Sequence, residues 1–161
     1  MVRPTYSIKV YACEYSYEGG NRAAGRQREL HEKYPSVKKV GAQGYCWDAK
    51  YAVILGSRPD EITAIATARP SSQITVEEIK AIKVPSLWCC AEKDRSFINN
   101  MRIQYEELLA NKVDLESTFK IYEGTKHGFV SRGDENNEKV QKASAEALND
   151  MKAFFTERSV I

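Results

Sequence analysis

The sequence predicts a three-layer α/β protein, in which a mostly parallel sheet of about five strands is covered by helices on both faces. Short runs rich in apolar and β-branched residues alternate along the chain with stretches of helical periodicity. The middle runs are apolar at successive positions, as expected for parallel strands that are buried on both faces. The length of 161 residues suits one domain, which we expect over residues 1–161.

Five segments have the composition of strands. The fourth contains Cys89 and Cys90, whose side chains should point to opposite faces and are poorly placed to bind one metal ion together. We expect both thiols to be free and buried. Pro85 stands near the start of this segment, where a missing backbone N–H costs little. The predicted strands are residues 6–13, 37–45, 62–68, 84–92 and 116–124.

Helical patterns fill most of the intervening chain, and a glycine-bearing loop is predicted at residues 16–21. Thr75, followed three residues later by Glu78, has the spacing of a capping box. Gly56 is placed to end the second helix. The predicted helices are residues 22–34, 47–57, 75–82, 98–112 and 136–158.

Charge and hydropathy exclude several classes of partner. The net charge is +2 and the basic residues are scattered, so we expect no nucleic acid and no anionic membrane as a partner. No apolar run approaches the roughly 18 residues of a membrane span. The first residues, MVRPTYSIKVYACEY, lack the pattern of a signal peptide. A cytoplasmic location is therefore expected.

Three chemically useful side chains follow strands of the predicted sheet. Cys46 follows the second strand, Asp94 the fourth and His127 the fifth. The carboxyl ends of parallel strands share one edge, where ligands of open α/β sheets bind. A thiol becomes a strong nucleophile beside an imidazole, which in turn needs a carboxylate on its other nitrogen. Each residue alone has an ordinary structural explanation, but the three together favour a catalytic triad.

The residues around Cys46 suit a nucleophile on a tight turn. Gly44 permits a sharp passage from strand to helix, and the start of the following helix favours a thiolate. The backbone N–H of Trp47 is then one candidate oxyanion donor. The chain order of nucleophile, acid and histidine is the order of an α/β-hydrolase.

Three segments resemble successive blocks of the dienelactone hydrolase (carboxymethylenebutenolidase) family, especially its fungal branch. They are GYCWDAKYAV, ARPSSQITVEEIKAIKVPSLWCCAEKDRSF and FKIYEGTKHGFVSRGDENN. The resemblance implies an α/β-hydrolase fold, with Cys46, Asp94 and His127 as the triad. It also implies action on esters and lactones of small, often anionic molecules, with no metal and no cofactor.

Four further residues are candidates for substrate binding, and the resemblance implies this role for one of them. Arg132 matches an arginine that approaches a substrate carboxylate in this family, although a solvated loop charge is an equal alternative. We expect Tyr45, Trp47 and Phe129 to form the walls of an apolar pocket.

Two features depart from the family pattern. The family has glycine two residues after the nucleophile, whereas this chain has Asp48, which must point outward or bend the turn and would oppose a thiolate. Family members also carry more structure before the nucleophile, so residues 1–36 are interpreted as an atypical, shortened N-terminal part. The candidate for the second oxyanion donor is then a backbone N–H of Gly19 or Gly20. An exposed sheet edge would favour a homodimer.

The leading hypothesis is a cofactor-independent hydrolase of a small ester, lactone or thioester. One alternative keeps the fold but uses His127 and Asp94 for proton transfer, as a cyclase or isomerase of a polyketide-like metabolite. A further alternative is a catalytically impaired, shortened relative.

Overall fold

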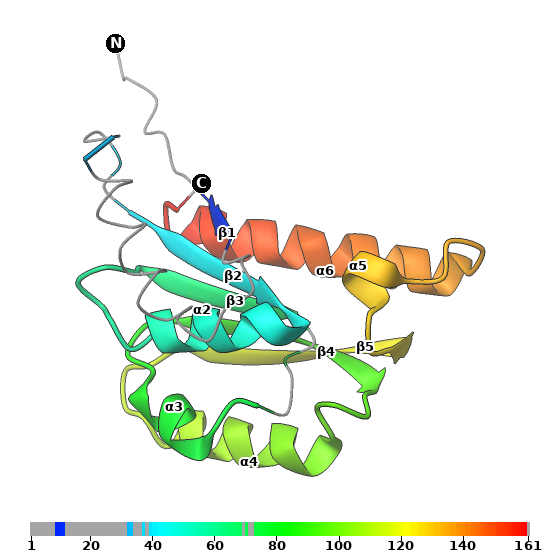
Figure 1. The fold of residues 1–161 in the computed structure, drawn as a ribbon, viewed down its shortest axis with the longest axis horizontal. Helices are drawn as coiled ribbons and strands as arrows, with labels where there is room; N and C mark the ends of the chain where they lie inside the picture. The colour runs from blue at the N-terminus through cyan, green and yellow to red at the C-terminus, as the bar shows by residue number, and fades with distance from the viewer. Residues whose placement is uncertain are drawn as a thin grey trace.

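The computed structural model describes residues 9–11, 32–33, 37, 39–68, 70 and 73–160. These contain a five-stranded sheet in the order β1-β2-β3-β4-β5, in which every neighbouring pair is parallel. The prediction of a parallel sheet of about five strands is therefore confirmed (Figure 1). The strands are β1 (Lys9–Tyr11), β2 (Gly41–Tyr45), β3 (Ala64–Ala68), β4 (Ser86–Lys93) and β5 (Ser117–Lys126).

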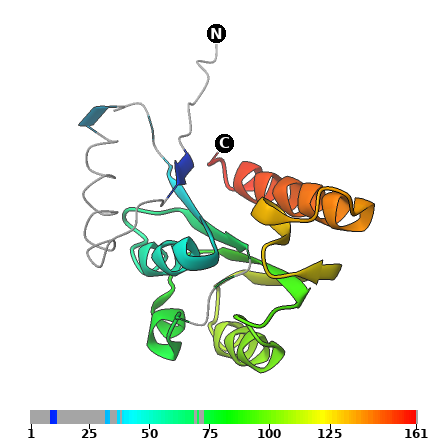
Figure 2. The ribbon, with the colours of Figure 1, turned by 45° about the vertical axis from the view of Figure 1, so that its right-hand side comes forward.

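The helices cover the sheet in two layers. From β2 to β5 each strand lies beside the next one in sequence, and right-handed crossovers then place all the connecting helices on one face. These are α2 (Ala49–Leu55), α3 (Val76–Ala81) and α4 (Asn99–Ala110). The last helix, α6 (Glu138–Glu157), packs on the opposite face, as Figures 1 and 2 show. The three-layer prediction is confirmed.

Successive side chains of a strand point to opposite faces of the sheet, so the core has two parts, one on each face. Ile65 and Trp88 pack toward α2, α3 and α4, whereas Leu87 packs toward α6. Cys89 and Cys90 belong to different parts, on opposite faces of β4, and both are free and buried as predicted. The sheet is thus buried on both sides at its centre, which explains the unbroken apolar character of β3 and of most of β4.

Helix α6 closes the face that the crossover helices leave open. Its buried residues recur at helical spacing and form one apolar stripe. The helix begins where the Asn137 side chain accepts hydrogen bonds from the backbone N–H groups of Lys139 and Val140. Burial of each large side chain in this stripe contributes roughly 1.5–3 kcal/mol. The stripe consists of Val140, Ala143, Ala147, Met151, Phe154 and Phe155.

The local predictions differ from the structure mainly at element ends. Strand β2 begins at Gly41 rather than at residue 37, and β5 continues to Lys126 rather than ending at residue 124. Helix α5 (Phe129–Arg132) was not predicted. The capping box of Thr75 and Glu78 is confirmed. Gly56 does end α2, but in a right-handed conformation with φ −60°.

The remaining N-terminal predictions lie largely outside the described residues. Of the first predicted strand, Lys9–Tyr11 is described and is extended. The loop at 16–21 is outside, as is the helix at 22–34 except for Glu32 and Lys33, which are helical. Within the described part of the chain, none of the helices combines the length and apolar character needed to cross a bilayer.

Candidate active site

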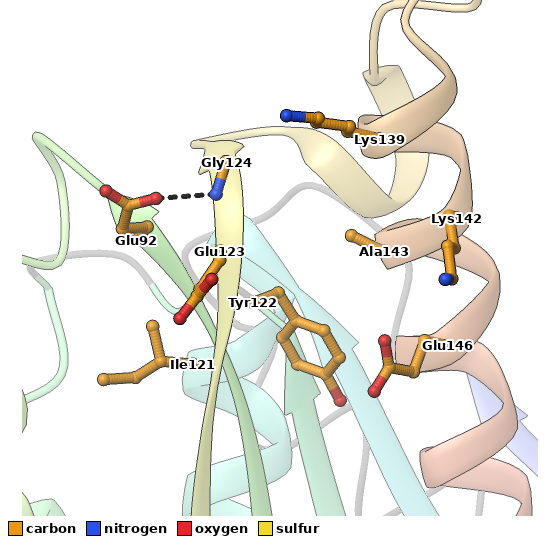
Figure 3. A pocket seen from close by; sticks show the side chains of 9 residues that line it. All are labelled: Glu92, Ile121, Tyr122, Glu123, Gly124, Lys139, Lys142, Ala143 and Glu146. Carbon is orange, nitrogen blue, oxygen red and sulfur yellow. Dashed lines mark hydrogen bonds between the residues drawn. The ribbon is translucent and has the colours of Figure 1, made fainter.

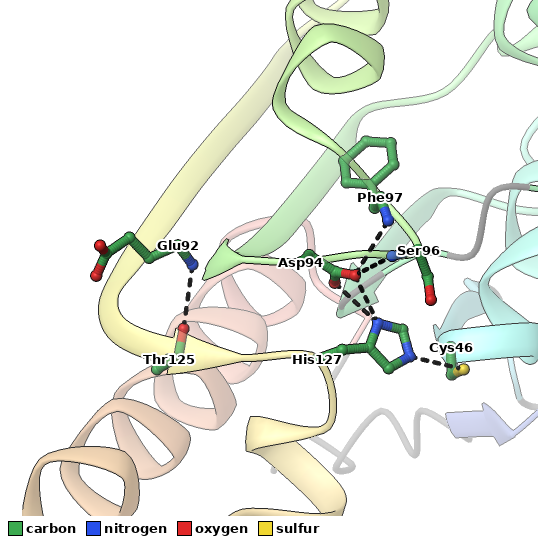
Figure 4. A network of polar contacts seen from close by, with 7 residues as sticks. All are labelled: Cys46, Glu92, Asp94, Ser96, Phe97, Thr125 and His127. Atoms are coloured by element: carbon green, nitrogen blue, oxygen red, sulfur yellow. Dashed lines mark hydrogen bonds and ion pairs between the residues drawn. The ribbon is translucent and has the colours of Figure 1, made fainter.

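Cys46, Asp94 and His127 meet at the carboxyl edge of the sheet. Cys46 directly follows β2, Asp94 follows β4, and His127 follows β5. The Cys46 Sγ atom lies 3.1 Å from Nε2 of His127. On the other side of the ring, Nδ1 lies 2.8 and 2.9 Å from the two carboxylate oxygens of Asp94. Figure 4 shows the resulting chain of contacts from thiol to imidazole to carboxylate.

The Asp94 carboxylate determines the tautomer of His127. A carboxylate only accepts hydrogen bonds, so the Nδ1 atom that contacts it carries a proton. This leaves Nε2 of the neutral ring as an acceptor for the Cys46 thiol. The Asp94 side chain is 1% exposed and the His127 side chain 23%, so this charge-assisted contact is shielded from water.

Two backbone groups hold the acid in place, and sequence reasoning did not identify them. The N–H groups of Ser96 and Phe97 donate to Oδ1 of Asp94, at 2.8 and 3.0 Å. These bonds compensate the burial of the carboxylate and restrict its rotation. The signal was present in the segment DRSF, since Asp commonly accepts backbone hydrogen bonds from the residues that follow it in a turn.

The turn after β2 places Cys46 in a strained conformation. Its φ is 54°, in the left-handed region, and residues Cys46–Asp48 form a single 3-10 turn before α2. Such a conformation costs a non-glycine residue about 1–3 kcal/mol and is common at functional sites. The turn is tight because Gly44 has no side chain. A Cβ atom on Gly44 would lie 2.3 Å from the Asp48 carbonyl oxygen.

Asp48 fits this turn without bending it. Its φ of −67° and ψ of −18° are ordinary right-handed values, so the glycine of the family pattern is not needed for backbone conformation here. The side chain is neither fully outward nor fully covered, and burial raises the pKa of its carboxyl above the ordinary value.

The remaining predicted site residues differ in their relation to Cys46, Asp94 and His127. Phe129, which is buried, and Arg132 line a cavity of about 270 Å³ together with His127. Trp47 is 37% exposed, and the Tyr45 hydroxyl donates to Sδ of Met151 on the α6 side of the sheet. Neither Trp47 nor Tyr45 lines that cavity. Gly19 and Gly20 lie outside the described residues.

A larger hollow, of about 600 Å³, lies between β5 and α6. Its lining includes Glu92, Tyr122 and Lys142 but no member of the triad (Figure 3). Among the described residues, no group of three or more His, Cys, Asp and Glu side chains is arranged to hold a metal ion.

Comparison with known proteins relates this chain to hydrolases. The model of the dienelactone hydrolase family matches residues 19–159. The hydrolase tropI of Talaromyces stipitatus is 36% identical over 129 residues, which cover 80% of this chain and 49% of that protein. The protein usf of Aquifex pyrophilus is 34% identical over 128 residues, covering 78% of this chain and 54% of that protein. The chain thus spans about half the length of these curated relatives.

Solved structures with low sequence identity share the fold. An acylaminoacyl peptidase of Pyrococcus horikoshii has a TM-score of 0.70 at 13% identity, covering 88% of this chain and 28% of that one. A dienelactone hydrolase-like promiscuous phosphotriesterase from metagenomic libraries has a TM-score of 0.64 at 20% identity, covering 86% of this chain and 61% of that one. The chain therefore belongs to the dienelactone hydrolase family and has the fold of the α/β-hydrolase superfamily.

Proposed function

We propose that this chain forms the active site of a cofactor-independent hydrolase that cleaves an ester, lactone or thioester bond of a small molecule. One observation carries the proposal: the Cys46 sulfur, the His127 ring and the Asp94 carboxylate are joined by contacts of 3.1 and 2.8 Å. These distances support the roles of nucleophile, general base and orienting acid. The family membership of the chain supports the same reaction class.

In the acylation step, Cys46 attacks the carbonyl carbon of the substrate. A bond forms between Sγ and carbon while the thiol proton passes to Nε2 of His127, and the carbonyl electron pair moves onto oxygen. When this tetrahedral intermediate collapses, the bond to the leaving group breaks. His127 then returns the proton to the departing alkoxide or thiolate, and a thioester remains on Cys46.

Deacylation repeats the sequence with water as the nucleophile. His127 takes a proton from water as the oxygen attacks the thioester carbon, and the carboxylic acid leaves as the Cys46 sulfur regains a proton. Asp94 remains ionised throughout and stabilises the imidazolium that forms in both halves of the cycle.

Stabilisation of the oxyanion is assigned to backbone N–H groups. The N–H of Trp47 follows the nucleophile directly and is the natural first donor. The sequence predicts a backbone N–H of Gly19 or Gly20 as the second donor, and both residues lie outside the described part of the chain. Each such donor contributes about 10²–10³ in rate.

The cavity that His127 lines suits a small substrate with an anionic group. Phe129 supplies an apolar wall and Arg132 a guanidinium, both on the lining that His127 shares. An arginine binds a carboxylate through two parallel hydrogen bonds, which would orient the substrate as well as attract it.

Replacement of the nucleophile tests the proposal. We expect Cys46→Ala to lower kcat on a small activated ester, such as p-nitrophenyl acetate, by at least about 10³-fold. The circular dichroism spectrum and the urea midpoint should remain close to those of the native chain, because Cys46 is only half-buried.

Three results would contradict the proposed hydrolysis. One is ester turnover that persists in Cys46→Ala. Another is a product with the same mass as its substrate, which would indicate a cyclase or isomerase. The third is a native Cys46 that reacts with iodoacetamide no faster than free cysteine, in a chain without ester turnover, which would indicate a catalytically impaired relative.

A further inference from the structure

The strands that present Asp94 and His127 lose their regular register just before these residues. β4 and β5 pair residue for residue from Ser86 with Ser117 as far as Ala91 with Tyr122. The next pair joins Lys93 to Lys126. Over this interval β4 advances by two residues and β5 by four, so β5 contains two extra residues in a bulge.

This bulge brings the acid and the histidine to the same level. Asp94 and His127 are the next residues after the Lys93–Lys126 pair. In an unbroken register Asp94 would lie opposite Thr125, two residues short of His127. At about 3.3 Å per residue, that is a displacement of roughly 6.6 Å along the strand. The contact of 2.8 Å between Asp94 and the imidazole therefore depends on the two extra residues.

Glu92 of β4 binds the bulge through hydrogen bonds of both its backbone and its side chain. The N–H of Glu92 donates to Oγ1 of Thr125 at 3.3 Å, as drawn in Figure 4. Its carboxylate accepts the N–H of Gly124 at 2.6 Å, as drawn in Figure 3. The Thr125 hydroxyl in turn donates to the Tyr122 carbonyl at 2.6 Å. This hydroxyl thus uses its donor and an acceptor site to join the start of the bulge to β4.

The side chains of Thr125 and Glu92 differ in their exposure to solvent. Thr125 is fully buried, so a lost hydroxyl would leave the Glu92 N–H and the Tyr122 carbonyl without their partner in a region that water reaches poorly. Glu92 is exposed, so substitution of its side chain should not disturb the core. Gly124 precedes Thr125 and donates its N–H to Glu92. Its φ is 73°, and a Cβ atom built on it would meet no other atom within 4 Å.

We propose that Glu92 and Thr125 are positioning residues, which hold the β5 bulge in the register that aligns His127 with Asp94. The inference rests on the proposed hydrolase reaction. Neither side chain contacts the thiol, the imidazole or the acid through a hydrogen bond that would make it a catalytic group. Their effect passes through the short chain segments that lead to Asp94 and His127.

Substitutions of Thr125 distinguish the effect of its hydroxyl group from the effect of its side-chain volume. Thr125→Val keeps the volume and removes both hydrogen bonds, and we expect kcat to fall about 10- to 100-fold while KM changes less than about twofold. Thr125→Ser restores the hydroxyl and should bring kcat back to within about threefold of the native value. At Glu92, Glu92→Gln keeps an acceptor for Gly124 and should stay near the native kcat, whereas Glu92→Ala should lower it.

A control substitution at the other end of the β4–β5 pair distinguishes a loss of His127–Asp94 alignment from a general loss of stability. The Ser86 hydroxyl contacts the Ser117 hydroxyl at 2.9 Å and accepts the Trp88 indole N–H at 2.9 Å. Ser86→Ala therefore also removes two contacts of a β4 residue, one partly buried and one buried, but at the end of the strand pair away from Asp94 and His127. We expect it to lower the urea midpoint as much as Thr125→Val does, with kcat unchanged.

Alkylation of Cys46 gives a readout that needs no turnover. The rate of reaction with iodoacetamide at pH 7 should fall in Thr125→Val and Glu92→Ala, because a misaligned imidazole activates the thiol less, and should stay native in Ser86→Ala. A native chain that hydrolyses no ester would end the proposed function, yet these alkylation rates would still test alignment. The inference is overturned if Thr125→Val and Ser86→Ala behave alike, or if Thr125→Ser fails to restore either rate. If Thr125→Val does not fold, equal rates in Glu92→Ala and Glu92→Gln overturn it.

Discussion

At the scale of single residues, Asp94 combines two roles that its surroundings make separable. Its Oδ1 atom accepts the backbone N–H groups of Ser96 and Phe97, which shapes the turn after β4. Both of its oxygens also contact Nδ1 of His127. The turn needs only an acceptor, whereas the imidazole needs a carboxylate that accepts on the side facing Nδ1.

Asp94→Asn should therefore remove activity without unfolding the turn. The amide oxygen can still accept from Ser96 and Phe97, while the amide nitrogen would donate to Nδ1 and force the wrong tautomer on His127. We expect kcat to fall by about 10⁴, with the free energy of unfolding within about 1 kcal/mol of the native value. Steady-state kinetics and urea unfolding measure the two quantities. Asp114→Asn, in the loop before β5, is the control and should change neither. Activity within tenfold of native in Asp94→Asn would exclude the orienting role.

At the scale of an element, the passage from β2 to α2 presents the sulfur. Strand β2 ends at Tyr45, Cys46 takes φ 54°, and one 3-10 turn leads into the helix. The backbone of Asp48 comes so close to β2 that only glycine fits at position 44. The position of the Cys46 sulfur thus depends on the lack of a side chain at Gly44.

Gly44→Ala should disrupt this element. The new Cβ would meet backbone rather than a movable side chain, so the turn must open. We expect a loss of about 1–3 kcal/mol in the free energy of unfolding and a fall of about 10²-fold in kcat. Gly56→Ala is the matched control at the other end of α2, because its Cβ would meet mainly the end of the Ile65 side chain and its φ is ordinary. Equal effects of the two substitutions on kcat would contradict the role given to Gly44.

At the scale of the whole molecule, the sequence was sufficient to predict the architecture. It also predicted that the side chains of Cys46, Asp94 and His127 lie close together. Periodicity identified the strands of the sheet, and parallel strands necessarily bring their carboxyl ends to one edge. The order Cys46, Asp94, His127 could therefore be interpreted as one site. The resemblance to a family located the same residues.

The features that escaped prediction depend on contacts between distant segments. The bulge in β5 exists only relative to β4, and no local pattern in YEGTKH indicates that two residues are extra. The hydrogen bond of the Tyr45 hydroxyl joins residues 106 positions apart. The sequence predicts Tyr45 beside the substrate, whereas its contact with Met151 of α6 follows only from tertiary packing.

The centre of the sheet also determines how stability should depend on alkaline pH. Cys89 is fully buried on the α6 side of β4, and burial raises the pKa of its thiol from 9.0 to about 11. The Tyr122 hydroxyl and Lys120 partly offset this rise, and Asp150 adds to it. Between pH 9 and pH 11 the unfolded chain therefore loses a proton that the folded chain keeps. Because the unfolded state then binds fewer protons, the free energy of unfolding decreases as the pH rises through this interval.

Cys89→Ala should reduce this alkaline loss of stability. One thiol with these two pKa values contributes stability that is nearly complete below pH 8 and falls by about 1.4 kcal/mol by pH 10. Urea unfolding of the native chain and of Cys89→Ala at pH 8, 9 and 10 measures the two slopes. The variant is expected to be less stable at pH 8, because it leaves a small cavity, and to lose less stability than the native chain on going to pH 10. Parallel slopes would show that the Cys89 thiol titrates alike in both states, and hence that the centre of the sheet is not closed to a thiolate.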